Sequence, residues 1–104
     1  MPDFYELEIV MRLGVVIGQV VSTVKHAALT RERLLLVKMI DASGTASGEM
    51  HVAADSIGAG NGEWVLLVSG SSARESTSES APVDLCVVGI IDEVVLDGAV
   101  AYHK

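Results

Sequence analysis

The residues of this chain that could take part in chemistry are few, and the first group is a glycine-rich run. Gly58, Ala59 and Gly60 look like the start of a phosphate-binding loop. The dinucleotide-binding pattern needs a third glycine three positions later and then a helix, whose N-terminal amides hold the phosphate. This chain instead has Glu63, whose carboxylate repels phosphate, followed by the strand-like run WVLLV. Nucleotide binding is therefore not expected.

The histidines and serines do not form a catalytic or metal-binding pattern. His26, His51 and His103 are far apart in the sequence and lack the close pairs typical of metal ligands. Ser71 and Ser72 lack the Gly-x-Ser-x-Gly turn that presents a nucleophilic serine. We therefore expect no enzyme activity, no metal and no cofactor.

Several carboxylates lie near the ends of predicted strands. In principle, two of them could act together as a catalytic acid and base. A carboxylate in that place more often accepts hydrogen bonds from turn amides or pairs with an arginine, for which Arg74 is the obvious candidate. The carboxylates are those of Asp55, Glu63, Asp84 and Asp92. We expect them to be structural.

Charge and composition exclude further classes of function. The formal net charge of −7 repels nucleic acid, and no basic stripe interrupts it. No apolar stretch approaches the roughly 18 residues of a membrane helix, and a secretory signal is not apparent at the N-terminus. Cys86 is the only cysteine, so an internal disulfide is impossible and a reducing cytoplasm is the expected location.

The chain is unusually apolar for its length. Half of its 104 residues are hydrophobic. A domain of this size buries only about two thirds of the surface that its unfolded chain exposes. Because soluble monomers rarely carry large exposed apolar patches, part of this surface should lie at a subunit interface.

Apolar and alternating runs predict five short strands and one short helix. The helix should begin near Ser72, because Ser72 and Glu75 have the spacing of a capping box. We expect an all-β fold in which the five strands form a small OB-like barrel. The predicted strands cover residues 12–24, 34–40, 49–54, 64–69 and 84–96.

Two strands carry more specific expectations. Gly14 and Gly18 should mark bulges or bends in the first strand. In the third strand we expect Met50 and Val52 to face inward, with Glu49 and His51 outward. The last strand is apolar on both faces, so one face should fill the barrel and the other should meet a neighbour.

Three motifs resemble one known family in order and spacing. They are GAGNGE (58–63), VSGSSAR (68–74) and PVDLCVVGIID (82–92). Together they are similar to the EutN/CcmL family, the vertex proteins of bacterial microcompartments. The resemblance covers residues 11–96, which leaves 1–10 as an N-terminal extension and 97–104 as a C-terminal tail.

The resemblance implies a structural shell protein that acts through its shape. Members of the family assemble as cyclic pentamers and close the corners of polyhedral shells in the cytoplasm. The implied partners are four further copies of the chain and the hexagonal facet proteins of the shell. The alternative function is an OB-type module that binds an oligosaccharide or single-stranded nucleic acid, but the aromatic residues are few and the charge is unfavourable.

The resemblance also implies residues at a subunit interface or near the five-fold axis. The GAGNGE glycines would allow close approach between chains, whereas the alternative is an exposed turn that needs only positive φ. Arg74 would be a structural ion-pair or hydrogen-bond donor. The expected interface residues are Gly58, Ala59, Gly60, Gly62, Glu63, Gly70, Ser71, Ser72, Ala73, Arg74, Asp84, Ile91 and Asp92.

Overall fold

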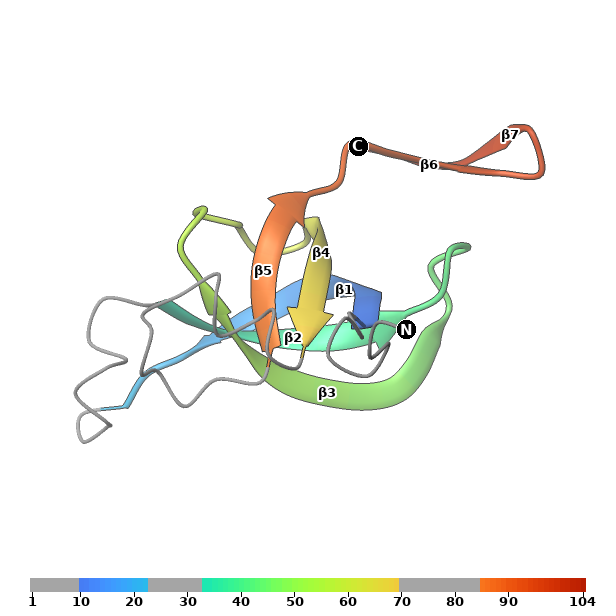
Figure 1. The fold of residues 1–104 in the computed structure, drawn as a ribbon. Coiled ribbons are helices and arrows are strands. Elements are labelled where there is room, and N and C mark those ends of the chain that lie inside the picture. The colour runs from blue at the N-terminus through green and yellow to red at the C-terminus, as the bar shows by residue number, and fades with distance from the viewer. Residues whose placement is uncertain (1–9, 23–32, 70–84) are drawn as a thin grey trace, which may run out of the picture.

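A computed structural model describes residues 10–22, 33–69 and 85–104 (Figure 1). The described residues form strands and no helix, and so none that is long and apolar enough to cross a membrane. The predicted helix at Ser72 lies outside them. The strands are β1 (Val10–Val20), β2 (Arg33–Ile40), β3 (Ala46–Asp55), β4 (Trp64–Ser69), β5 (Leu85–Ile90), β6 (Glu93–Leu96) and β7 (Ala99–His103).

The first five of these strands close into a barrel in the order β1-β2-β3-β5-β4, which confirms the predicted fold. Neighbouring strands are antiparallel except for β3 and β5, which pair in parallel over only Ala54–Cys86 and Asp55–Val87. β3 is strongly curved and wraps around one side of the barrel (Figure 1). β6 and β7 form a separate antiparallel hairpin that projects away from the barrel.

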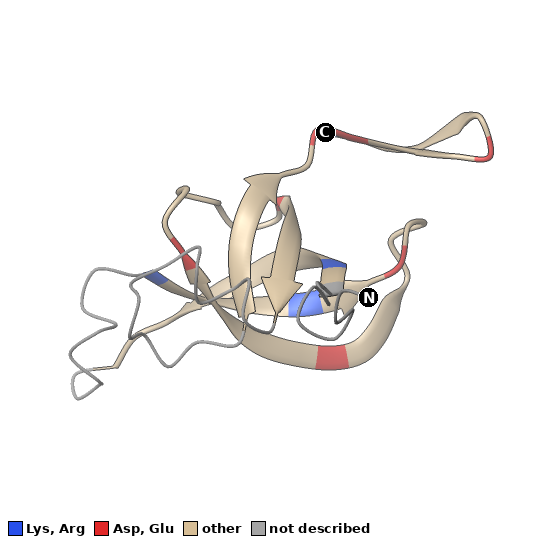
Figure 2. Ribbon diagram, viewed as in Figure 1, with Lys and Arg blue, Asp and Glu red and all other residues tan. Residues whose placement is uncertain are grey.

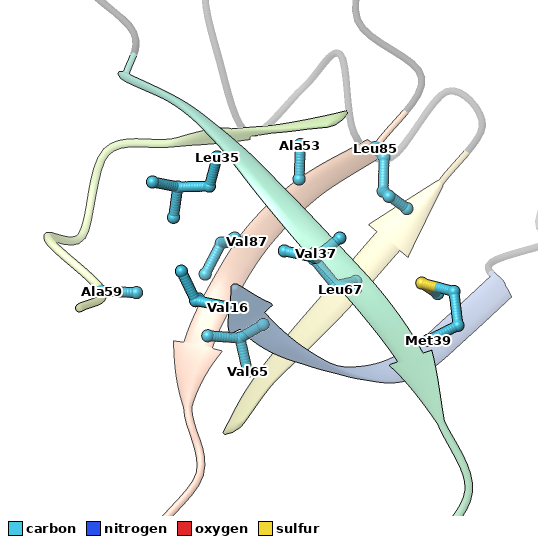
Figure 3. Close-up of a cluster of buried hydrophobic side chains, with 10 residues drawn as sticks. All are labelled: Val16, Leu35, Val37, Met39, Ala53, Ala59, Val65, Leu67, Leu85 and Val87. Carbon is cyan, nitrogen blue, oxygen red and sulfur yellow. The ribbon is translucent and has the colours of Figure 1, made fainter. Parts of the chain in front are cut away.

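Aliphatic side chains from all five barrel strands fill the interior (Figure 3). β2 contributes every second residue, because alternate side chains of a strand point to opposite faces. Ala59, from the loop between β3 and β4, completes one end of this core. The core consists of Val16, Leu35, Val37, Met39, Ala53, Ala59, Val65, Leu67, Leu85 and Val87.

The prediction for the two faces of β3 is wrong. Met50 and Val52 lie opposite Lys38 and Leu36, which alternate with the buried residues of β2 and therefore face outward. Both apolar side chains are exposed, by 59% for Met50 and 48% for Val52. The apolar face of this strand is thus the outer one.

The last predicted strand, 84–96, is also wrong as a single element. β5 ends at Ile90, and the chain leaves the barrel through Ile91 and Asp92 before β6 begins. Residues 97–104, expected to be a tail, contain the turn at Asp97 and Gly98 and the returning strand β7.

The two glycines of β1 have different roles. The register of β1 on β2 shifts between Val16 and Gly18, which confirms a bulge next to Gly18. Gly14 is buried, and a Cβ there would lie 2.8 Å from Leu67 Cδ1 and 3.3 Å from the Lys38 carbonyl oxygen. Gly14 therefore lets β1 lie close to the core, whereas a Cβ at Gly18 would meet only Leu36 Cβ at 4.0 Å.

We expect Gly14→Ala to lower the free energy of unfolding by about 1–3 kcal/mol, because an extra methyl overpacks the core. Gly18→Ala is the matched control in the same strand and should change it by less than about 1 kcal/mol. Denaturant titration at one fixed protein concentration measures both. Equal losses from the two variants would contradict the packing role of Gly14.

Candidate functional site

The loop between β3 and β4, residues 56–63, contains the GAGNGE motif and covers one end of the barrel. We call residues 56–63 the β3–β4 loop. It begins directly after Asp55, the one charged residue buried among those that the structure describes, with 1% of its surface exposed. The geometry of this loop decides what the motif can do.

The Asp55 carboxylate fixes the first half of the loop. Its Oδ1 accepts hydrogen bonds from the amides of Ile57 (3.0 Å) and Gly58 (3.3 Å). Its Oδ2 accepts from the amides of Gly58 (3.1 Å) and Ala59 (3.0 Å), and lies 3.5 Å from Arg33 Nη1. A buried carboxylate is tolerable only with such partners, so these hydrogen bonds hold the first half of the loop on this path.

The second half of the loop is bonded to the bulge of β1. The Gly62 amide donates to the Val16 carbonyl at 2.8 Å, and the Val16 amide donates to the Glu63 carbonyl at 3.0 Å. With its side-chain amide assigned as the donor, Asn61 Nδ2 lies 3.2 Å from Val16 O and 3.3 Å from Ile17 O. Asn61 therefore satisfies carbonyl oxygens next to the register shift.

Glu63 connects the loop to the base of the β6–β7 hairpin. Its Oε1 accepts from the Gly60 amide at 2.6 Å, and its Oε2 lies 2.7 Å from Lys104 Nζ. The hydrogen bond from Lys104 and that from Gly60 lower the pKa of Glu63, and the same contact raises the pKa of Lys104. The carboxylates of Asp55 and Glu63 thus both hold the backbone of the loop.

Three further contacts fix where the hairpin leaves the barrel. The rings of Trp64 and Tyr102 stack with centroids 3.8 Å apart and an interplanar angle of 11°. The Ile91 amide donates to the Trp64 carbonyl, and the Lys104 amide donates to the Asp92 carbonyl, each at 2.9 Å. Ile91 and Asp92, both expected at an interface, therefore lie where the chain passes from barrel to hairpin.

The loop glycines fit the simpler interpretation within one chain. Gly58 and Gly62 have φ of 99° and 87°, and neither would place a Cβ within 4 Å of another described atom. Gly60 lacks a positive φ, and its Cβ would meet only Glu63 Oε1, at 3.4 Å. Positive φ accounts for the first two glycines, while contact between chains at this loop stays a prediction.

Other expected site residues have different outcomes. The prediction that strand-end carboxylates accept turn amides is confirmed for Asp55 and Glu63. Their cationic partners are Arg33 and Lys104, which the sequence did not indicate because both are distant in the chain. Six of the expected interface residues lie outside the residues that the structure describes: Gly70, Ser71, Ser72, Ala73, Arg74 and Asp84.

Metal-binding geometry is not found among residues 10–22, 33–69 and 85–104. These ranges hold no group of three His, Cys, Asp or Glu side chains placed to bind a metal ion. Glu49 pairs with His51 at 3.0 Å and with Arg12 at 3.5 Å, and these side chains are partly exposed. The hydrogen bond from His51 lowers the pKa of Glu49.

We expect Asp55→Asn to lower the free energy of unfolding by about 1–3 kcal/mol. Asparagine replaces one accepting oxygen by an NH2 group, which cannot accept a hydrogen bond from the buried backbone amides. Asp41→Asn is a matched control, since Asp41 Oδ1 also accepts from two turn amides, those of Ser43 and Thr45, but is exposed to water. That variant should lose much less stability, because water can replace the lost interactions of an exposed side chain. Denaturant titrations giving the same loss for both would show that burial of Asp55 is unimportant.

The contact between Glu63 and Lys104 should depend on pH. Because folding lowers the pKa of Glu63 below its ordinary value of 4.5, its contribution is complete above that pH and disappears as pH falls through the lower folded value. The melting temperature of the parent should exceed that of Glu63→Gln at pH 6 to 8, and the difference should shrink below pH about 4. A difference that does not shrink at any pH below 4.5 would contradict this assignment.

The chain is similar to known shell proteins over nearly its whole length. A sequence profile described as "Ethanolamine utilisation protein EutN/carboxysome" matches residues 11–92. The chain is 61% identical over 99 residues to the bacterial microcompartment shell vertex protein EutN of Salmonella typhimurium, covering 94% of this chain and 100% of that protein.

Solved structures agree with this match. A structure of the ethanolamine utilization protein EutN superimposes with a TM-score of 0.84 at 60% identity, covering 89% of this chain and 98% of the other. The pentameric microcompartment shell protein GrpN from Rhodospirillum rubrum superimposes with a TM-score of 0.74 at 44% identity, covering 82% and 99%. With the family profile, the sequence identity and the barrel in agreement, this chain belongs to the EutN/CcmL family.

Proposed function

We propose that this protein is a pentameric vertex protein that closes the corners of a bacterial microcompartment shell in the cytoplasm. The observation that carries the proposal is the 61% identity to a shell vertex protein over that protein's entire length. The structure of GrpN, described as pentameric, supports the ring of five. Rings form when two different patches of one chain meet head to tail and the rotation closes.

The proposed function depends on geometry, and catalysis has no part in it. A flat layer of six-fold tiles cannot close, and five-fold units at the corners supply the missing curvature. The partners are therefore four more copies of the chain and the hexagonal facet proteins of the shell. The hydrogen bonds that Asp55 accepts from the loop amides are consistent with a structural role for the motif.

The alternative function, an OB-type module that binds an oligosaccharide or single-stranded nucleic acid, has less support. Its strand face would need aromatic platforms in a basic groove. In the described part of the chain the aromatic residues are Trp64 and Tyr102, and they stack on each other. The only Lys and Arg residues there are Arg12, Arg33, Lys38 and Lys104, and all but Lys38 pair with a carboxylate.

Native mass spectrometry of the full chain tests the function directly. We expect one species of five chains at micromolar concentration. A stable monomer would contradict the proposal, and a hexamer would contradict the vertex geometry while leaving the family membership intact.

The β3–β4 loop is our candidate for the region where subunits crowd together, and Gly60 is the residue that tests it. Valine at Gly62 strains one chain by itself, because φ there is positive, so it cannot separate the two interpretations. Gly60 lacks a positive φ, and a Cβ there would meet only the Glu63 side chain, at 3.4 Å from Oε1 and 4.0 Å from Cδ. We expect β-rich circular dichroism to be kept while the pentamer is lost on size exclusion. An intact ring would remove Gly60 from the interface.

A further inference from the structure

The β3–β4 loop contains a pair of residues that can react with each other. Asn61 is the only asparagine of the chain, and Gly62 follows it. In such a pair the backbone nitrogen of the glycine can attack Cγ of the asparagine, because glycine has no Cβ to obstruct the approach. A C–N bond forms, the side-chain nitrogen leaves as ammonia with the proton of the glycine amide, and a five-membered imide remains. Water then opens the imide to aspartate or to isoaspartate, in which the backbone runs through the side chain.

The fold keeps both reacting groups of this pair engaged elsewhere. The attacking nitrogen of Gly62 donates its proton to the Val16 carbonyl at 2.8 Å. The side chain that would be attacked is held on the same strand, where Asn61 Nδ2 lies 3.2 Å from Val16 O and 3.3 Å from Ile17 O. Both contacts have to open before the nitrogen can lose its proton and reach Cγ. The bulge of β1 therefore protects the pair.

A tight turn holds the same peptide bond from the other side. Gly60 and Glu63 exchange two hydrogen bonds, one from the Glu63 amide to the Gly60 carbonyl at 3.1 Å and one from the Gly60 amide to Glu63 Oε1 at 2.6 Å. Asn61 and Gly62 are the central residues of this turn, and the φ of 87° at Gly62 is typical of a type II turn. Glu63 therefore restricts how the reacting pair can move.

Water reaches the pair once these contacts open. Asn61 is exposed, and it lines a cavity of about 120 Å³ whose other walls include Gln19 and Arg33. Water relays the proton from the glycine amide to the departing ammonia and later opens the imide. The reaction thus needs only solvent.

We propose that Asn61 is a site of spontaneous deamidation whose rate is set by the fold of the β3–β4 loop. The reaction is slow while the contacts to β1 and the turn persist, and it reaches the rate of an unstructured chain where the loop opens. This modification goes beyond the function proposed above. It depends on hydrogen bonds within one chain, so it applies to a free subunit as well as to a ring.

Deamidation replaces a hydrogen-bond donor by a negative charge. The new carboxylate cannot donate to the carbonyl oxygens of Val16 and Ile17, and its charge repels them. The loop is otherwise uncharged between Asp55 and Glu63, and Figure 2 shows it in tan between two acidic segments. A third negative charge in so short a segment adds repulsion. The modified loop is therefore bound less firmly to β1.

Intact-mass spectrometry measures the reaction, because it replaces NH2 by OH and the chain holds one asparagine and one glutamine, Gln19. The full chain is incubated at mildly alkaline pH, once folded and once in urea, and peptide mapping assigns the change to residue 61. We expect the unfolded chain to react at least about ten times faster, because opening of the loop has to precede attack. Equal rates in the two samples would overturn the proposal.

Two substitutions at Glu63 form a matched pair. Glu63→Gln keeps an accepting oxygen for the Gly60 amide, whereas Glu63→Ala removes it, and both lose the ion pair with Lys104. We expect folded Glu63→Gln to deamidate at the parent rate and folded Glu63→Ala to deamidate about three times faster or more. Hydrogen exchange of the Gly62 amide should rise by the same factor in Glu63→Ala, since one opening exposes both groups. Parent rates of both processes in Glu63→Ala would show that the turn does not control the reaction.

The product identifies the chemical route. Passage through the imide leaves both isoaspartate and aspartate at position 61, whereas direct hydrolysis of the side-chain amide leaves aspartate alone. Asn61→Gln is the control, because glutamine would have to form a larger ring. Isoaspartate that persists in this variant comes from another site, such as Asp97-Gly98. Aspartate alone at position 61 of the parent would rule out attack by Gly62.

Asn61→Asp and Asn61→Ala test what the modification does to the loop. Both remove the donor, but only Asn61→Asp adds the carboxylate that deamidation produces. The Gly62 amide should exchange with solvent faster than in the parent in both variants, and fastest in Asn61→Asp. The Gly44 amide, which donates to the Asp41 carbonyl in a separate turn, is the internal control and should not change. Exchange of Gly62 in Asn61→Asp at the parent rate would contradict the loosening.

Native mass spectrometry of the same samples keeps this proposal separate from the proposed function. A parent protein that is monomeric, yet reacts much more slowly folded than unfolded, would refute the vertex function and leave the deamidation site standing. A pentamer that reacts as fast as the unfolded chain would have the opposite meaning.

Discussion

The burial of one carboxylate, that of Asp55, is the constraint on which this structure depends. Its charge is removed from water at the point where β3 ends, and backbone amides of the next turn replace the lost solvation. Those bonds direct Ala59 into the end of the core and bring the rest of the loop to the bulge of β1. Glu63 then lies where it reaches Lys104, so the path of the hairpin base follows from the same carboxylate.

Much of this fold could be predicted from the sequence. Short apolar runs between turn residues gave five barrel strands close to their observed positions, and the high apolar content predicted an interface. The carboxylates at strand ends were correctly expected to accept turn amides, because that interaction is local in the chain. Hydrogen bonds between residues that are close in sequence can be predicted from the local residue types.

The errors arose where residues distant in the chain decide the outcome. The prediction that Met50 and Val52 face inward is wrong because an exposed apolar side chain on the outer face of a strand has the same sequence pattern as one in a core. The strand 84–96 was continued through Asp92 because the residues on both sides of it are equally apolar. Arg33 and Lys104 were missed as ion-pair partners because nothing in the local sequence relates them to Asp55 or Glu63.

The short parallel pairing of β3 with β5 also has a consequence for the order of folding. β1, β2 and β3 follow one another as antiparallel neighbours, so their pairing requires the chain to close only modest loops. The barrel closes only when Ala54 and Asp55 meet Cys86 and Val87, which are far along the chain. Contacts of such long range form slowly. We therefore expect the pairing of β3 with β5 to be the step that completes the barrel, late in folding.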